Sequence, residues 1–201
     1  MTKRIAVIAS GRGSNFQAVI DAVKAGAVPA TCVALITDNP KAYAIKRAEQ
    51  AQVPVIIVDY AAYSSRQEYE LALLRAMQRV NPDLFVLAGY MRIVGKEIVQ
   101  AFSGRMINIH PALLPSFTGL HAQRQAVAYG VKVSGCTVHF VDESLDGGPV
   151  IVQQAVPVME GDDEDTLAER TLAHEHECLP YAIRLFCEDR LVIDGRIVRI
   201  K

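Results

Sequence analysis

Hydrophobic and polar positions alternate in blocks along the first half of the chain, and these blocks predict strands and helices in turn. A buried strand is expected at residues 5–9, where an apolar run ends abruptly at glycine. Apolar residues then recur at helical spacing from Phe16 to Val23, and Gly26 and Pro29 end that helix. The same reading predicts strands at 31–37, 53–58, 84–88 and 105–109, and helices at 41–52, 65–80 and 96–102.

The second half has strands that lie closer together in sequence. Strands are expected at 137–141 and 149–158, followed by a long helix at 163–187 that Pro180 should kink or interrupt. A hairpin with an Asp194-Gly195 turn closes the chain. Prolines and glycine make the stretch after residue 110 irregular, and residues 117–134 are expected to form a loop that is either mobile or static.

This order of elements predicts an α/β fold with a Rossmann-like, mostly parallel sheet and helices on both faces. The closely spaced strands of the C-terminal half are expected to be antiparallel additions. The sequence has no internal repeat or linker-like stretch, so a single domain over residues 1–201 is the simpler expectation.

The glycine-rich segment at residues 10–15 joins the first strand to the first helix. Free backbone amides at such a turn, with the helix dipole behind them, favour a phosphate or another anion. Ser14 or Asn15 is expected to cap the helix. Phe16 stands at the third glycine position of a dinucleotide fingerprint, which disfavours a nicotinamide-dependent oxidoreductase. Asp38 resembles the ribose-binding acid of that fold, but a turn-forming role before Asn39 is the preferred interpretation.

Three polar residues stand out against their apolar surroundings. Asn108 and His110 lie two apart near the carboxyl end of a predicted strand, so both project from one face where α/β sheets bind ligands. Asp146 precedes two glycines that permit a sharp turn. A carboxylate beside an imidazole stabilises the imidazolium, and an amide can hydrogen-bond a developing oxyanion. Asn108, His110 and Asp146 are therefore a candidate catalytic set for acyl transfer, although neighbouring backbone groups or a plain turn would also explain each residue alone.

Composition and charge restrict the partners. The net charge of −1 argues against a nucleic-acid backbone as the main partner, and no apolar run approaches the roughly 18 residues of a membrane span. The four cysteines form no C-x-x-C pair, so reduced thiols in the cytoplasm are expected. His174 and His176 point about 200° apart on a helix and cannot chelate one ion, so no metal is expected. The expected assembly is a monomer or a weak homodimer.

Four motifs together resemble the folate-dependent formyltransferases. They occur in order along the chain at residues 10–15 (SGRGSN), 88–93 (AGYMRI), 107–115 (INIHPALLP) and 145–149 (LDGGP). The resemblance spans almost the whole chain, and the N-I-H-P segment paired with a downstream D-G-G-P is highly specific. It implies formyl transfer from 10-formyltetrahydrofolate to the amine of glycinamide ribonucleotide in purine biosynthesis, by direct attack through a tetrahedral intermediate.

The resemblance also implies roles for residues of this chain. Asn108 and protonated His110 would stabilise the oxyanion, and Asp146 would keep His110 charged. The implied ribonucleotide contacts are Gly13, Ser14, Asn15 and Glu175. The implied folate contacts are Arg66, Met91, Arg92, Ile93, Val94, Asn108, Asp142, Glu143, Ser144, Leu145 and Asp146.

Three positions depart from the family pattern. Ala112 replaces the usual serine after His-Pro, Ser116 replaces a lysine, and Leu172 stands where a glutamine often lies near the substrate phosphate. A side-chain phosphate contact at Leu172 is therefore not expected.

Related activities make competing predictions. A formyltetrahydrofolate hydrolase would carry an extra N-terminal domain, whereas the first strand is expected at Ile5. A methionyl-tRNA formyltransferase would carry a further C-terminal domain and a basic surface. A non-catalytic nucleotide- or folate-binding module would need the glycine loop without keeping all three catalytic candidates.

Overall fold

The computed structural model describes residues 2–201. The chain divides into two compact units, Met1–Ile107 and Asn108–Lys201, which we call unit 1 and unit 2. The family-like motifs are shared between them, since the glycine loop belongs to unit 1 and the three catalytic candidates belong to unit 2.

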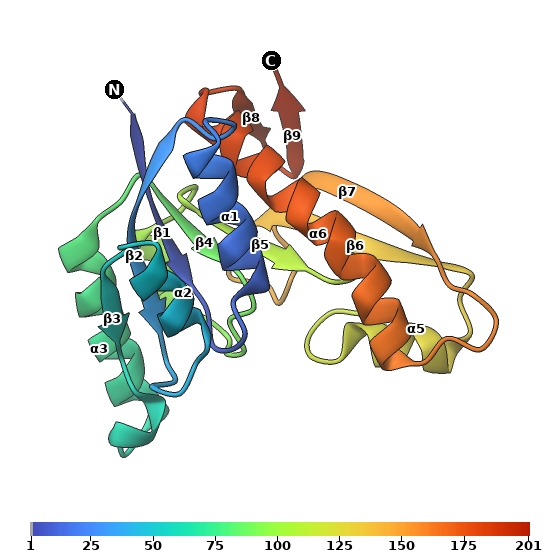
Figure 1. Cartoon of the computed structure of the whole chain (residues 1–201), viewed down its shortest axis with the longest axis horizontal. Helices are drawn as coiled ribbons and strands as arrows, with labels where there is room; N and C mark the ends of the chain where they lie inside the picture. The colour runs from blue at the N-terminus through green and yellow to red at the C-terminus, as the bar shows by residue number, and fades with distance from the viewer. Residues whose placement is uncertain (1) are drawn as a thin grey trace. The chain divides into compact units, whose positions relative to one another are not determined.

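Unit 1 is a parallel β-sheet covered by helices (Figure 1). Its strands lie in the order β3-β2-β1-β4 and all pair in parallel. The elements are β1 (Lys3–Ile8), α1 (Ser14–Lys24), β2 (Ala30–Thr37), α2 (Ala44–Gln50), β3 (Val55–Ile57), the 3₁₀ turn η1 (Tyr60–Ala62), α3 (Arg66–Val80), β4 (Leu84–Leu87) and α4 (Lys96–Ala101).

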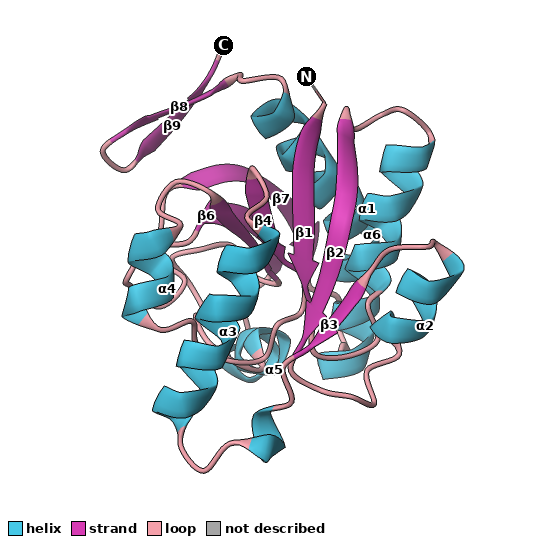
Figure 2. Cartoon of the chain, turned by 90° about the vertical axis from the view of Figure 1, so that its left-hand side faces the viewer, coloured by secondary structure: helices cyan, strands magenta, loops and turns pink. Residues whose placement is uncertain are grey.

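Figure 2 shows α1 and α2 on one face of this sheet and α3 and α4 on the other. Strands covered on both faces carry continuous apolar runs, which explains why Ile5–Ile8 and Leu84–Leu87 are buried throughout. Asn81 ends α3 in a left-handed conformation with φ of 37°. The prediction that Asn81 and Pro82 stop this helix is therefore confirmed.

Strand β5 (Met106–His110) crosses from unit 1 into unit 2. The remaining elements are α5 (Ala122–Tyr129), β6 (Val133–Phe140), β7 (Val150–Pro157), α6 (Glu164–Cys187), β8 (Leu191–Asp194) and β9 (Ile197–Ile200). Strands β6 and β7 form a long antiparallel pair, and β8 and β9 form the C-terminal hairpin. A parallel contact between Val150 and Ile197 attaches the hairpin to β7.

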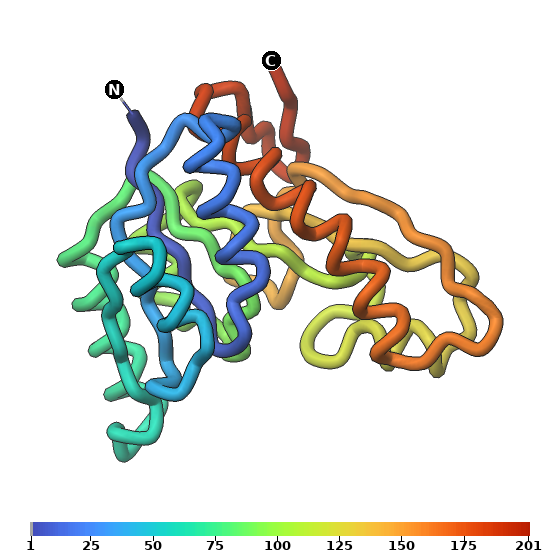
Figure 3. Tube along the Cα trace, viewed as in Figure 1, coloured from blue at the N-terminus to red at the C-terminus, as the bar shows by residue number. Residues whose placement is uncertain are grey.

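The start of α6 packs against α5 and β7. Ala126, Val156 and Leu167 form a buried cluster there, and Figure 3 traces α5 beside the N-terminal end of α6. Asp163 caps α6 in a capping box with Thr166. The predicted α/β class, with parallel strands first and antiparallel additions in the C-terminal half, is confirmed.

Several local predictions were wrong in detail. Residues 122–129 form helix α5 rather than part of a loop, and α6 continues through Pro180 to Cys187. Pro180 is tolerated because the packing of α6 on β6 and β7 supports the helix around it. The hairpin turn is formed by residues 195 and 196, since Asp194 still pairs with Ile197.

Helix starts also differ from their predicted caps. Ser65 caps α3 as expected, but the Glu68 carboxylate accepts hydrogen bonds from the backbone and hydroxyl of Ser64 instead of closing the box. At α1 the capping position is Gly13, with no side-chain cap, so Ser14 and Asn15 do not play that role. Across residues 2–201, no helix combines the length and hydropathy needed to cross a bilayer.

Candidate active site

The glycine loop of unit 1 presents the first turn of α1. Gly13 has φ of +68°, a left-handed conformation that favours glycine, and its carbonyl accepts the first helical hydrogen bond from Gln17. A Cβ at Gly13 would lie 2.7 Å from the Ala44 Cβ, so space as well as backbone conformation requires glycine there. Since no side chain caps α1, its N-terminal amides keep the anion-binding geometry that the sequence predicts.

Ser10 connects this loop to the segment that contains Met91. Its backbone amide donates to the Gly89 carbonyl at 3.1 Å, and its hydroxyl accepts from the Met91 amide at 3.0 Å. The Asn39 side chain donates to the Ser10 carbonyl at 3.2 Å. Two motifs that are far apart in sequence, at residues 10–15 and 88–93, are therefore held side by side within unit 1.

Asp38 does not form the turn that was predicted for it. Asn39 makes that turn, because its side-chain oxygen accepts from the Lys41 amide at 2.9 Å. Asp38 is buried and accepts a hydrogen bond from Arg92 Nε at 2.5 Å, while the Arg92 guanidinium lies 3.4 Å from the centre of the Tyr60 ring. The charge of Arg92 is thus neutralised within unit 1, which favours backbone over guanidinium contacts for the folate role predicted at this residue.

Arg66 lies against the same segment. Its Nε donates to Glu70 at 2.6 Å and its terminal nitrogen reaches the Ile93 carbonyl at 3.5 Å. The hydrogen bond to Glu70 raises the pKa of Arg66, so this exposed side chain stays cationic. Unit 1 therefore brings Arg66 together with residues 91–94, as the folate-site prediction requires.

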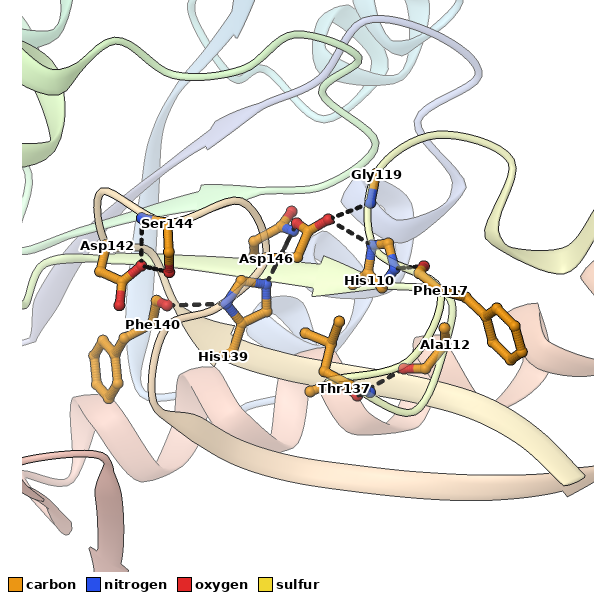
Figure 4. A network of polar contacts seen from close by, with 12 residues as sticks. His110, Ala112, Phe117, Gly119, Thr137, His139, Phe140, Asp142, Ser144 and Asp146 are labelled. Carbon is orange, nitrogen blue, oxygen red and sulfur yellow. Dashed lines mark hydrogen bonds and ion pairs between the residues drawn. The ribbon is translucent and has the colours of Figure 1, made fainter. Parts of the chain in front are cut away.

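In unit 2 the two nitrogens of His110 both face acceptors (Figure 4). The side chain is buried at the end of β5. Nε2 lies 2.8 Å from the Phe117 carbonyl, which can only accept, so Nε2–H is the donor. Nδ1 lies 3.5 Å from Asp146 Oδ2. Only the charged imidazolium can donate to both groups, so the surroundings match the protonated ring.

The turn around Asp146 is unusual in its backbone. Asp146 itself has φ of +50°, and its Oδ2 also accepts a 2.8 Å hydrogen bond from the Gly119 amide. The two following glycines provide space rather than left-handed conformations. A Cβ at Gly147 would overlap the Ser144 side chain, and one at Gly148 would overlap the Phe140 carbonyl oxygen. The D-G-G motif therefore lets two chain segments approach closely behind a carboxylate directed at His110.

We expect Gly148→Ala to lower the free energy of unfolding by about 2–3 kcal/mol, because the added methyl group collides with backbone that cannot rotate away. Urea denaturation would measure this change. Gly11→Ala is the matched control, since no heavy atom lies within 4 Å of a Cβ at that glycine. Equal losses in the two variants would contradict the steric explanation.

His139 belongs to this cluster and was missed by the sequence reading. Its Nδ1 lies 2.9 Å from the Phe140 carbonyl and must donate to it. Burial lowers the pKa of His139, so the ring is neutral and its Nε2 is an acceptor. That nitrogen lies 3.2 Å from Asn108 Nδ2, which therefore donates to it. The 3.9 Å separation from Asp146 Oδ1 is accordingly no ion pair.

This arrangement orients the Asn108 amide, because one amide hydrogen is directed at His139 and the other remains available to a ligand. The signal in the sequence was a titratable residue at position 139 within an otherwise apolar strand end, on the same face as Thr137. Sequence reasoning treated that strand only as structure.

A pH prediction follows from His139. Below its ordinary value of 6.5 the unfolded chain binds a proton that the folded protein refuses, because burial lowers the folded-state pKa. The free energy of unfolding should therefore fall as the pH drops below 6.5, by at most about 1.4 kcal/mol per pH unit for one site. His139→Gln, which keeps an acceptor without titrating, should lose less stability than the native chain between pH 7.5 and 5.5 in urea denaturation. An unchanged difference would rule out His139 as the source.

The remaining predicted residues of unit 2 lie on the loop after β6 and on α6. The Asp142 carboxylate accepts hydrogen bonds from the backbone and hydroxyl of Ser144, which shapes the loop that leads to Asp146 (Figure 4). Glu175 is buried on α6. Ala112, which departs from the family pattern, is fully buried and its carbonyl accepts from the Thr137 hydroxyl at 2.7 Å. Among residues 2–201 no cluster of three or more His, Cys, Asp or Glu side chains is arranged to hold a metal ion.

Comparison with known proteins gives consistent results. The sequence profile of the formyl transferase family, described as "Formyl transferase", matches residues 3–183. The chain is 42% identical over 187 residues to phosphoribosylglycinamide formyltransferase of Escherichia coli, covering 93% of this chain and 88% of that protein. It is also 42% identical over 197 residues to the trifunctional purine biosynthetic protein adenosine-3 of Drosophila melanogaster, of which it spans only 15%.

Solved structures agree with these sequence relatives. Glycinamide ribonucleotide transformylase 1 from Symbiobacterium toebii superposes with a TM-score of 0.96 at 51% identity, covering 99% of this chain and 94% of that one. A formyltetrahydrofolate deformylase from Pseudomonas syringae is similar at 25% identity, with a TM-score of 0.92, and 66% of its chain is covered.

Proposed function

The chain belongs to the formyl transferase family, and on this basis we propose that it transfers the formyl group of 10-formyltetrahydrofolate to the amine of glycinamide ribonucleotide. The observation that carries the proposal is the cluster of unit 2, in which Asp146 faces His110 and His139 orients Asn108. Such a set provides an oxyanion-stabilising amide and a charged proton donor without a nucleophile of its own, which is what direct acyl transfer needs.

In the proposed reaction the ribonucleotide amine attacks the formyl carbon, and a new C–N bond forms as the carbonyl oxygen becomes an oxyanion. Asn108 and His110 stabilise that charge by hydrogen bonding. The tetrahedral intermediate collapses when the bond to the folate nitrogen breaks, and a proton is delivered to that nitrogen. The attacking amine loses a proton, so the overall charge balances.

His110 can act in this way because its proton is already directed. Nε2–H donates to the Phe117 carbonyl at 2.8 Å, and exchanging this acceptor for the substrate oxygen leaves the ring and its contact with Asp146 in place. Asp146 favours the imidazolium electrostatically and positions a water that carries the transferred proton. We assign it this supporting role because its other contact is with the backbone of Gly119.

Binding roles are proposed for the other predicted residues. The amides of Gly13, Ser14 and Asn15 would hold the substrate phosphate, supported by the uncapped start of α1. Glu175 is assigned to the ribonucleotide as well. For the folate we propose Arg66, Met91, Arg92, Ile93 and Val94 of unit 1, and Asn108, Asp142, Glu143, Ser144, Leu145 and Asp146 of unit 2.

We further propose one formyltransferase domain over residues 1–201, supported by a family match that runs through both units. The reaction as written needs no metal. Small molecules are the proposed partners, rather than nucleic acid or membrane, in keeping with a net charge of −1. A cytoplasmic location suits the four free cysteines. The proposed assembly is a monomer or a weak homodimer.

The test is to mix the protein with 10-formyltetrahydrofolate and glycinamide ribonucleotide and to follow the deformylated folate and the formylated amine. Both products should appear in equal amounts, and only when both substrates are present. Deformylation without the ribonucleotide would instead indicate a hydrolase. Tight folate binding without turnover would indicate a binding module.

A further inference from the structure

Two cysteines that are 42 positions apart in sequence contact one another in unit 2. Cys136 lies in the middle of β6 and Cys178 lies on α6, and their thiols are hydrogen-bonded with Cys136 as the donor. Both are free thiols. The sequence shows no C-x-x-C spacing, so only the packing of the helix on the strand creates this pair.

The contact follows from the orientation of β6. Alternating side chains of a strand point to opposite faces, so Cys136 lies on the face opposite Thr137 and His139. Helix α6 packs on β6, as Figure 1 shows within this unit, and Cys178 follows the buried Glu175 by three residues, close to the same helix face. The thiol pair is therefore in the α6–β6 interface, away from the cluster around His110.

The two thiols differ in the way that disulfide chemistry requires. Cys178 is partly exposed, and the hydrogen bond from Cys136 lowers the pKa of its thiol. Cys136 is fully buried, and the same hydrogen bond together with burial raises its pKa. The accessible sulfur thus carries the negative charge, while its buried neighbour is placed to react second. Oxidation-sensitive cysteines commonly combine an accessible thiolate with a resolving thiol.

We propose that Cys136 and Cys178 are a redox modification site, which closes to an intramolecular disulfide when the protein meets a peroxide. The bond would join α6 covalently to β6. Its formation does not depend on the proposed function.

The chemistry balances in two steps. The Cys178 thiolate attacks one peroxide oxygen, the O–O bond breaks, and the products are a sulfenic acid and water once a proton is taken up. Cys136 then loses its proton and attacks the sulfenic sulfur, so that the S–S bond forms and the hydroxyl group leaves as a second water. Two thiols are oxidised, one peroxide is reduced, and two waters are released. The sulfurs must approach to about 2.05 Å, which the hydrogen-bonded contact permits with a small shift of α6.

Cys32 provides an internal control. Burial raises the pKa of its thiol to about 12, and its weak hydrogen bond is to the Ala34 carbonyl. A protonated and largely buried thiol of this kind should react slowly with peroxide.

The experiment treats the folded native chain with a modest excess of hydrogen peroxide, blocks the remaining thiols after denaturation, and maps the peptides by mass spectrometry. We expect the thiol count to fall from four to two, with one linked peptide that joins Cys136 to Cys178 and is released by dithiothreitol. Cys32→Ser should still form this link. Four free thiols after treatment, or links that join separate chains, would overturn the proposal.

Single variants test the order of the steps. With Cys136→Ser, a sulfenic acid should accumulate at Cys178 and be trapped by dimedone, because the resolving thiol is gone. With Cys178→Ser, dimedone labelling at Cys136 should stay at background. Labelling of Cys136 in that variant would contradict the assignment of Cys178 as the reactive thiol.

Discussion

Replacing His110 by alanine should lower kcat for formyl transfer by about 10²–10³-fold and change the KM of either substrate by no more than a few-fold. The loss corresponds to about 2.7–4 kcal/mol of transition-state stabilisation. The imidazolium is matched to charge that develops only as the formyl oxygen becomes an oxyanion, so ground-state binding depends on it little. Steady-state measurement of kcat and KM for both substrates checks this.

His174→Ala is a suitable control for this experiment. His174 is a partly exposed residue of α6 whose Nδ1 lies 3.6 Å from Glu177, and it has no role in the proposed reaction. We expect its variant to keep the native rate. A rate for His110→Ala within threefold of the native value would remove His110 from the mechanism, provided that circular dichroism shows a folded protein.

Asp146→Asn should also reduce kcat, by about a hundredfold or more, with little loss of stability. Asparagine tolerates the left-handed conformation that Asp146 adopts at φ of +50°, and its side-chain oxygen can still accept from the Gly119 amide. What disappears is the negative charge 3.5 Å from His110 Nδ1, and with it the preference for a charged ring. Alanine would be a poorer choice, because it would add backbone strain to the electrostatic change.

Two measurements distinguish these causes. Hydrogen exchange at the Gly119 amide should stay as slow as in the native protein, which would show that the loop is intact while activity is lost. Asp194→Asn, at an exposed carboxylate of the hairpin that pairs with Arg199, should leave the rate unchanged. Fast exchange at Gly119 together with lost activity would mean that Asp146 acts by holding the loop, against the proposed electrostatic role.

The elements of the fold were predictable where the signal is local. Buried strands such as β1 and β4 are short apolar runs bounded by turn residues, and α3 has a capping serine and a terminal Asn-Pro. Helix α5 was not predicted, because its short sequence follows prolines and glycines and its helicity depends on packing against α6. The effect of Pro180 was mispredicted for a related reason, since neighbouring strands support α6 around it.

The chemistry of the site divides in a similar way. Asn108, His110 and Asp146 were identifiable from the sequence because polar residues at the end of an apolar strand and before two glycines are locally anomalous. His139 was not, because nothing nearby in sequence shows that its neutral ring would orient Asn108. The role of Asp38 was mistaken because its partner, Arg92, is 54 residues away.

The amino-acid sequence by itself determined the α/β class, the order of most elements, the family motifs and three catalytic candidates, since each is written in short-range periodicity or in a contiguous motif. Only the tertiary structure decided which acceptors face His110, which proton His139 keeps, how the charge of Arg92 is neutralised and that Cys136 meets Cys178. These properties depend on burial and on contacts between residues distant in sequence, and both arise only when the strands and helices pack.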